Sequence, residues 1–225
     1  MERLLLNLKY VWIPSFFLGK ATLTDSLPSL YRNYHLDIEK APSNNLTVQL
    51  CNVRSLFNKL NLIKLHFSTN NSIGMFFLTE TWLCDKISDS MLSINNFSIL
   101  RSDRQHSIGG GVALIYKNVL KVKQLIVDVN RYLADIDNFE FLGIDYFVGN
   151  FRVRMLCFYL PPAFSSCLST VKTVCKLIEQ LSDSFVPCFV LGDFNLPNID
   201  WKVYSSTGGP SHNHFLHFCN CNTWS

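Results

Sequence analysis

Oxygen-bearing side chains stand directly after three apolar runs of this sequence. The run VQLC is followed by Asn52, MFFL by a threonine and then Glu80, and CFVL by a glycine and then Asp193 and Asn195. Ligands of α/β sheets bind beyond the carboxyl ends of the strands, so these side chains are expected to converge. Carboxylates and amides with no Cys or His among them are donors that suit Mg²⁺, which keeps other positions for water and phosphate oxygens. The pattern therefore indicates chemistry on a phosphate ester.

Three chemical roles fit such a set of residues. A glutamate can anchor the cation, an aspartate can orient a water molecule for in-line attack, and an amide can hold a non-bridging phosphate oxygen. Each residue alone is weak evidence, because Gly192-Asp193 is also ordinary turn chemistry and Glu80 could be a surface charge. Their shared position after strands is what favours a site.

The elements that must position these residues begin at Leu46. Residues 46–53 predict a strand, residues 55–67 a helix and residues 73–80 a second buried strand. The helix has one apolar face, formed by Leu56, Leu60, Ile63 and Phe67.

The middle of the chain is rich in strands. Short turns separate the segments FSILRSD, GVALIYK, LKVKQLIVDV, FEFLGIDYF and FRVRMLCFY, and Gly149-Asn150 suits a tight hairpin. A helix is expected over 166–181, with a stripe of Leu168, Val171, Cys175 and Ile178, and the strand VPCFVL follows it. The pattern predicts an α/β fold, with largely antiparallel central pairing and two packed sheets covered by helices.

The domain is expected to span residues 45–225. Residues 1–44 contain Pro14, Pro28 and Pro42 without sustained periodicity, and we treat them as an N-terminal extension of uncertain order. With 225 residues, the chain has the length of one large domain.

Composition narrows the class of protein further. A hydrophobic fraction of 48% excludes wholesale disorder, and a net charge of +3 is too small to argue for nucleic-acid binding. The sequence has no apolar run of about 18 residues or more that would indicate a membrane span. Eight scattered cysteines without a CxxC pattern indicate a reducing compartment, so we expect a nuclear or cytoplasmic protein. No obligate protein partner is evident.

Several motifs together resemble a known group of enzymes. They are CNVRSL (51–56), LTETWL (78–83), RSDRQHSIGGGVALIYK (101–117), YLPP (159–162) and LGDFNLPNIDW (191–201). In this order they resemble the endonuclease/exonuclease/phosphatase superfamily, and most of all the apurinic-type endonuclease domain of non-LTR (LINE-like) retrotransposons. The resemblance implies a four-layer α/β/β/α sandwich of two mixed sheets and a Mg²⁺- or Mn²⁺-dependent phosphodiester hydrolase that nicks DNA.

The resemblance also implies a role for individual residues. Glu80 is expected to be the principal metal ligand with Asn52 beside it, Tyr159 to contact the scissile phosphate or stabilise developing charge, and Asp193 to position or deprotonate the attacking water. Asn195 would bind the phosphate and help to orient these groups. Arg54 and Arg104 are expected to support the site or contact backbone phosphates.

The sequence departs from the family pattern in two places. Leu160 stands where the family often has arginine, and no Asp-His pair occurs, although the family closes with a Ser-Asp-His signature on late strands. The expectation is a domain that lacks its last two or three strands, with a loss of about 10²- to 10³-fold or more in rate for the missing histidine. A catalytically inactive remnant or binding module therefore stays open, as does another phosphoesterase of the superfamily, although GGGVALIYK and GDFNLPNIDW favour the retrotransposon branch.

Three further features have competing interpretations. Gly109–Gly111 is expected to be a flexible turn before a strand, not a phosphate loop. Trp82 could stack on a base or pack at the rim of the core. The third feature is a group of histidines and cysteines near the end of the chain, which could bind zinc or lie on a helix that packs on the core. Its members are His212, His214, His217, Cys219 and Cys221.

Overall fold

Two five-stranded sheets form the centre of the protein. The computed structural model describes residues 12–13, 32–36, 46–105, 108–127, 138–182, 186–201 and 203–221. One sheet has the order β2 (Arg32–Leu36), β3 (Leu46–Asn52), β4 (Ile73–Thr79), β6 (Val112–Lys117) and β5 (Phe97–Ser102). The other has the order β1 (Trp12–Ile13), β10 (Cys188–Asp193), β9 (Phe151–Tyr159), β8 (Glu140–Val148) and β7 (Lys121–Gln124).

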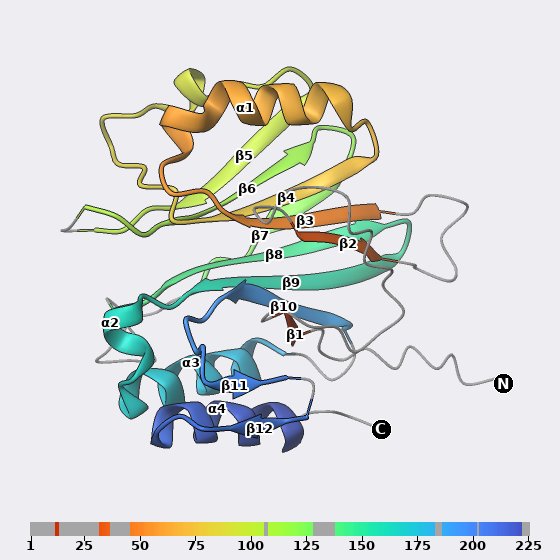
Figure 1. Ribbon diagram of the computed structural model, residues 1–225. Coiled ribbons are helices and arrows are strands. Elements are labelled where there is room, and N and C mark those ends of the chain that lie inside the picture. The colour runs from red at the N-terminus through yellow and green to blue at the C-terminus, as the bar shows by residue number, and fades with distance from the viewer. Residues whose placement is uncertain are drawn as a thin grey trace, which may run out of the picture.

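Helices cover the outer face of each sheet, which makes four layers (Figure 1). Helix α1 (Leu56–Thr69) lies on the β2–β6 sheet, while α3 (Leu168–Leu181) and α4 (Pro210–Cys221) lie on the β7–β10 sheet. The shorter elements are η1 (Asp89–Leu92), α2 (Pro162–Ser165), β11 (Ile199–Asp200) and β12 (Ser205–Ser206). The predicted α/β sandwich of two mixed sheets is confirmed.

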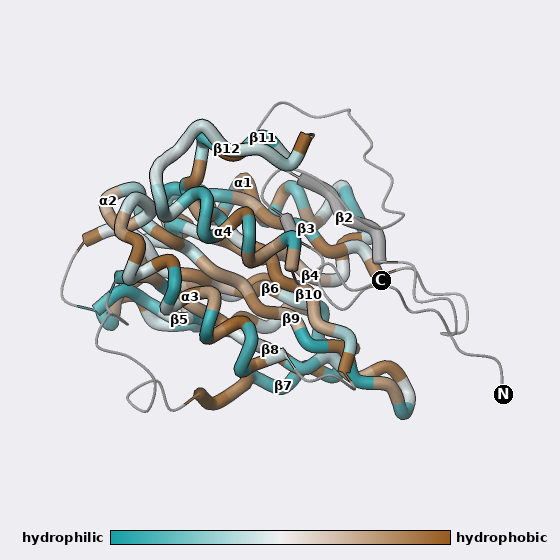
Figure 2. Tube along the Cα trace, turned by 90° about the horizontal axis from the view of Figure 1, so that it is seen from below, coloured by the Kyte–Doolittle hydropathy of each residue, from teal (hydrophilic) through white to brown (hydrophobic). Residues whose placement is uncertain are grey.

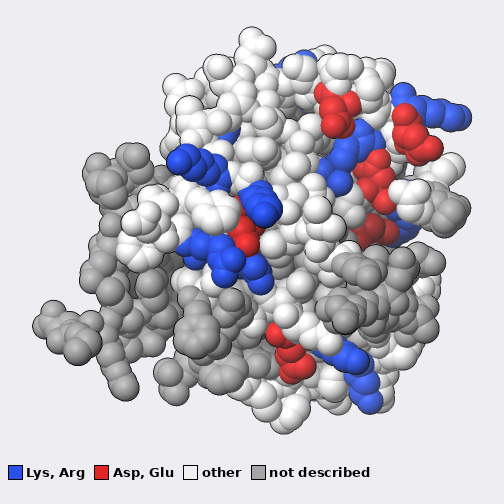
Figure 3. All heavy atoms as spheres, turned by 180° about the vertical axis from the view of Figure 1, so that it is seen from behind, with Lys and Arg blue, Asp and Glu red and all other residues white. Residues whose placement is uncertain are grey.

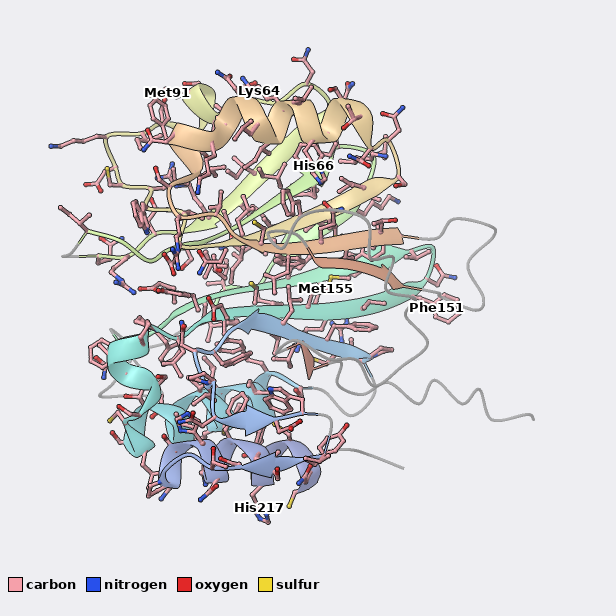
Figure 4. All side chains as sticks on the ribbon, viewed as in Figure 1. Lys64, His66, Met91, Phe151, Met155 and His217 are labelled. Atoms are coloured by element: carbon pink, nitrogen blue, oxygen red, sulfur yellow. The ribbon has the colours of Figure 1, made fainter. Side chains whose placement is uncertain are left out.

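Three apolar cores hold the layers together. The core between the sheets includes Phe77 and Met155. Figure 4 labels Met155 between the two sheets. Another core joins β9 and β10 to α3 and α4, and a third joins β3, β4 and β6 to α1. Because β4 faces both the inter-sheet core and α1, all of its residues are buried, which explains why its sequence is apolar without alternation.

Helix α1 buries the face that the sequence predicts, formed by Leu56, Leu60, Ile63 and Phe67. In Figure 4, His66 points toward the sheet and Lys64 away from it. Nε2 of His66 lies 2.8 Å from Oε1 of Gln49, and burial lowers the pKa of the imidazole.

Helices α3 and α4 lie side by side, and both combine apolar and polar segments along the tube in Figure 2. The predicted stripe on α3 was too narrow, because Thr170, Val174 and Leu177 are buried as well. Leu168 is only partly buried, since it stands at the first residue of the helix.

The strands differ from the prediction mainly in where they end. The predicted 186–191 strand is β10 (Cys188–Asp193), because its parallel pairing with β9 continues to the register pair Asp193–Tyr159. The segment predicted from Leu120 to Val129 forms a strand only over β7, and its positions 128 and 129 lie outside the described residues. The central hairpins are antiparallel and are divided between the two sheets.

Two short strands come from residues 1–44. β1 pairs with β10 in parallel, and β2 pairs with β3 in antiparallel fashion, so each adds an edge to one sheet. The rest of this segment lies outside the described residues. Within the described part of the chain, no helix combines the length and apolar character that a crossing of a lipid bilayer requires.

Candidate active site

The ends of β3, β4, β9 and β10 meet at one end of the sandwich, where α1 and α2 begin (Figure 1). Nδ2 of Asn52, at the end of β3, donates to Oε1 of Glu80 at 2.7 Å and to Oδ2 of Asp193 at 2.8 Å. One amide therefore links two carboxylates that belong to different sheets.

Tyr159 and Asn195 complete the group. The Tyr159 hydroxyl donates to Oε1 of Glu80 at 3.2 Å. The backbone N–H of Asn195 donates to Oδ1 of Asp193 at 3.3 Å, and its side chain donates to the carbonyl oxygen of Leu160 at 2.9 Å. Each oxygen of Asp193 thus accepts a hydrogen bond, which fixes the orientation of its carboxylate.

Burial and the two carboxylates keep the Tyr159 phenol protonated. Burial raises the pKa of Tyr159 most, and the nearby Glu80 and Asp193 raise that pKa further, against a smaller opposing effect of Arg104. Because the neutral phenol is favoured, Tyr159 acts as a hydrogen-bond donor in the site.

The backbone beside these residues has an unusual conformation. Arg54, Glu80 and Asn195 have φ angles of 41, 53 and 48 degrees. These angles lie in the left-handed region, which costs about 1 kcal/mol or more for residues other than glycine. Backbone hydrogen bonds from Val53 to Thr79 and from Ser55 to Glu80, both 2.9 Å, hold this geometry beyond the ends of β3 and β4. Such strain is typical of functional sites.

The Gly109–Gly111 turn supports the other side of Glu80. The carbonyl oxygens of Gly110 and Gly111 accept hydrogen bonds from the backbone N–H groups of Trp82 (2.9 Å) and Thr81 (3.3 Å). A methyl group at Gly110 would lie 2.4 Å from Cζ of Arg104. The triple glycine is thus a turn before β6, as expected, and it leaves room for a guanidinium group.

That guanidinium belongs to a buried ion pair which the sequence prediction missed. Nε and Nη2 of Arg104 donate to Oε1 and Oε2 of Glu140 at 2.5 and 3.1 Å. Burial raises the pKa of Glu140, against the opposing effect of Arg104 and of a hydrogen bond from Gly111. A charge inside the apolar stretch FEFLGI was the available signal, because a buried carboxylate needs a partner.

The two predicted arginines therefore occupy different environments. The Arg54 side chain is 73% exposed, and its Nε lies 3.9 Å from Oε2 of Glu80. Arg104 is mostly buried, and its Cζ lies 5.8 Å from the centroid of the Tyr159 ring. Arg54 is thus open to a ligand, whereas Arg104 is held between Glu140 and Tyr159.

The donor set fits a hard divalent cation. Glu80 and Asp193 offer carboxylate oxygens, and Oδ1 of Asn52 is buried without a hydrogen-bond partner. Mg²⁺ is commonly held by one or two carboxylates and retains several waters, so it needs no larger protein cage. Among the described residues, no group of three His, Cys, Asp or Glu side chains could hold a metal ion.

The histidines and cysteines near the end of the chain all lie on α4, but on different sides of it. His212 and Cys219 are buried against the core, while Cys221 is exposed and its Sγ lies 3.4 Å from Nε2 of His217. His217 lies on the outer side of α4 in Figure 4. The described residues thus support a helix packed on the core and form no zinc cluster.

Charges of both signs lie beside each other on the face shown in Figure 3. Among the described residues, opposite charges also pair, with Arg101 3.1 Å from Asp89 and Arg152 3.6 Å from Asp145. The described residues on this face do not form a single basic area.

Comparison with solved structures places this geometry among known folds. An AP endonuclease from Archaeoglobus fulgidus matches with a TM-score of 0.56 and 13% identity, over 78% of this chain and 70% of that chain. The chain has the endonuclease/exonuclease/phosphatase fold. No family model matches the sequence, and no curated protein matches it.

Two further structures share the endonuclease/exonuclease/phosphatase fold with this chain. The endonuclease domain of TRAS1, a telomere-specific non-LTR retrotransposon, matches with a TM-score of 0.52 and 11% identity, over 77% of this chain and 68% of that domain. The 3′ phosphatase NExo from Neisseria, bound to a product DNA hairpin, matches with a TM-score of 0.54 and 16% identity, over 77% of this chain and 70% of NExo. At these identities the likeness concerns the fold.

Proposed function

We propose that this chain is a divalent-metal-dependent phosphodiester hydrolase that nicks DNA, of the type found in non-LTR retrotransposons. One observation carries the proposal: the Asn52 amide joins Glu80 and Asp193, which are 28 and 141 residues away in sequence. The motif order and the endonuclease/exonuclease/phosphatase fold support it. A nuclear site of action fits a DNA substrate.

Glu80 is the principal ligand for Mg²⁺ or Mn²⁺ in this proposal, with Asn52 beside it. When bound, the cation supplies Lewis-acid polarisation of a phosphoryl oxygen. Asn52 also keeps Glu80 and Asp193 at a fixed separation, since both accept from the same nitrogen.

The other residues position water and phosphate. Asp193 orients the attacking water and accepts its proton, while its own orientation is held by Asn52 and by the backbone of Asn195. Tyr159 remains a donor and can turn from Glu80 to the negative charge that develops on the phosphate. Exposed Arg54 is available to a backbone phosphate.

Nicking of supercoiled plasmid DNA tests the proposal. The wild-type chain is expected to nick the plasmid with Mg²⁺ and to lose this activity in EDTA. Glu80→Gln keeps the size of the side chain and one oxygen acceptor but removes the charge, so we expect a fall in rate of about 10²-fold or more. Glu179→Gln changes an exposed glutamate of α3 and should nick at the wild-type rate.

Two outcomes of the nicking assay would contradict the proposal. Nicking that survives both EDTA and Glu80→Gln would come from another site or a contaminant and would contradict the proposal. A soluble, folded chain that never nicks would also overturn it. Circular dichroism of each variant separates lost chemistry from lost folding.

A further inference from the structure

Trp82 is an exposed aromatic residue next to the candidate active site. It follows Glu80 by one intervening residue, and its exposed fraction is 43%. Tryptophan carries a large apolar surface, which proteins commonly bury or use at interfaces. Its exposure here leaves part of the indole ring open to solvent, two residues after Glu80.

The backbone of Trp82 is held in place from two directions. Its N–H donates to the carbonyl oxygen of Gly110 at 2.9 Å, and the N–H of Leu56 donates to the carbonyl oxygen of Thr81 at 2.9 Å. Trp82 also has a left-handed φ of 53°. A fixed backbone in a strained conformation lowers the ordering cost of a contact made by the indole ring.

The indole ring and the Arg104 guanidinium both lie close to Gly109. A methyl group at Gly109 would lie 3.9 Å from Nε1 of Trp82 and 3.8 Å from Nη1 of Arg104. Arg104 in turn lies over the Tyr159 ring, and the Tyr159 hydroxyl donates to Glu80. The indole ring therefore lies by the same glycine as a guanidinium that covers Tyr159, the residue that touches Glu80.

We infer that Trp82 stacks on a nucleobase of the strand that is cut, close to the scissile phosphate. The inference rests on the proposed function. It narrows the substrate class to polynucleotides with a base that can unstack from its neighbours, as opposed to simple phosphate esters. Stacking on an aromatic ring accepts any base, because every base has a π-face. Trp82 thus adds affinity with little sequence preference.

Phe151 provides a matched control for this inference. Its exposed fraction is 51%, similar to that of Trp82, but it begins β9, whereas Tyr159 ends it. Figure 4 shows Phe151 at the end of the sandwich opposite to the glycine turn and α2. Phe151→Ala removes an exposed aromatic residue without touching the site.

Binding to two single-stranded oligonucleotides of equal length and charge tests the inference. One has normal bases, and the other has abasic sugars at every position. The measurement is made with Mg²⁺ in the Asp193→Asn background, so that the strands stay intact. Trp82→Ala is expected to weaken binding of the normal strand by about 5- to 150-fold and that of the abasic strand not at all.

Two further variants check whether aromatic stacking is the cause of the weaker binding. Trp82→Phe should retain most of the affinity, since phenylalanine also stacks, and Phe151→Ala should bind both strands as the background does. If both strands bind equally and Trp82→Ala does not change their affinity, the stacking role is overturned, while the proposed nuclease function stands. Failure of the background to bind either strand, with no nicking by the wild type, would overturn the proposed function and the stacking role together.

Discussion

At the scale of single residues, Asn52 decides how the site is assembled. Its Nδ2 atom is the only group among the described residues for which hydrogen bonds to both Glu80 and Asp193 are observed. Without it, two carboxylates from different sheets would face each other with no shared donor. Loss of a group that orients metal-binding side chains typically costs about 10- to 100-fold in metal affinity or activity.

Asn52→Ala is expected to raise the Mg²⁺ concentration for half-maximal nicking by about 10- to 100-fold, because Glu80 and Asp193 lose their common donor. A magnesium titration of the nicking rate measures this change. Asn61→Ala, on the exposed side of α1, is the control and should titrate as the wild type does. An Asn52→Ala curve that overlays the wild type would show that the bridge has no part in metal binding.

At the scale of elements, the turn before β6 supports the active-site segment that follows β4. Gly110 has a φ of 64°, and a side chain there would also meet the Arg104 guanidinium. Gly149, in the β8–β9 hairpin, has a similar φ of 58° with nothing within 4 Å of the place a methyl group would take. The two glycines share one conformational requirement but differ in their surroundings.

Gly149→Ala is expected to lower the free energy of unfolding by about 1 kcal/mol and to leave nicking unchanged, because only backbone strain is added. Gly110→Ala should destabilise more and reduce nicking, since Arg104 must leave Glu140 and the support of Trp82 shifts. Urea unfolding and plasmid nicking of both variants provide the comparison. Equal effects of the two substitutions would mean that the turn acts through its conformation alone.

At the scale of the whole molecule, buried thiols occur in each of the three cores. Cys157 lies between the sheets, Cys51 lies under α1, and Cys175, Cys188 and Cys219 lie under or between α3 and α4. Burial raises the pKa of Cys51 and of Cys188 to about 11 each, and it also raises the pKa of Cys157, Cys175 and Cys219.

These thiols are expected to make the fold sensitive to alkaline pH. An unfolded thiol ionises near its ordinary pKa of about 8.5, whereas the buried thiol stays protonated, so the unfolded state binds fewer protons as the pH rises. The stabilisation is therefore complete below about pH 8.5 and is lost as the pH rises toward 11. With Cys175→Ala, the fall of the unfolding free energy with rising pH should become shallower by about 1.4 kcal/mol per pH unit.

Val174→Ala is the control for this slope. It truncates a buried residue of the same helix that cannot ionise, so it should lower the unfolding free energy equally at each pH. Urea unfolding from about pH 7 to about pH 10.5 under reducing conditions measures both variants over the range in which an unfolded thiol ionises. A Cys175→Ala slope identical to that of Val174→Ala would contradict the expected alkaline effect.

The sequence by itself determined the kinds of the main elements, and it placed Asn52, Glu80 and Asp193 at or just after strands. It also identified the buried face of α1, because a helix repeats its apolar residues at a local period that the sequence displays directly. The motif order pointed to the endonuclease/exonuclease/phosphatase fold, although no family model matches the chain.

Only the tertiary structure decided how the strands divide between two sheets and which donors meet at the site. The Arg104–Glu140 pair joins residues 36 positions apart, and Nδ2 of Asn52 reaches carboxylates 28 and 141 positions away. The extension of β10 to Asp193 depends likewise on its pairing with β9. Such contacts depend on which apolar faces pack together. The apolar periodicity of a single element does not specify which other element it packs against. The exposure of Trp82 follows from the same packing.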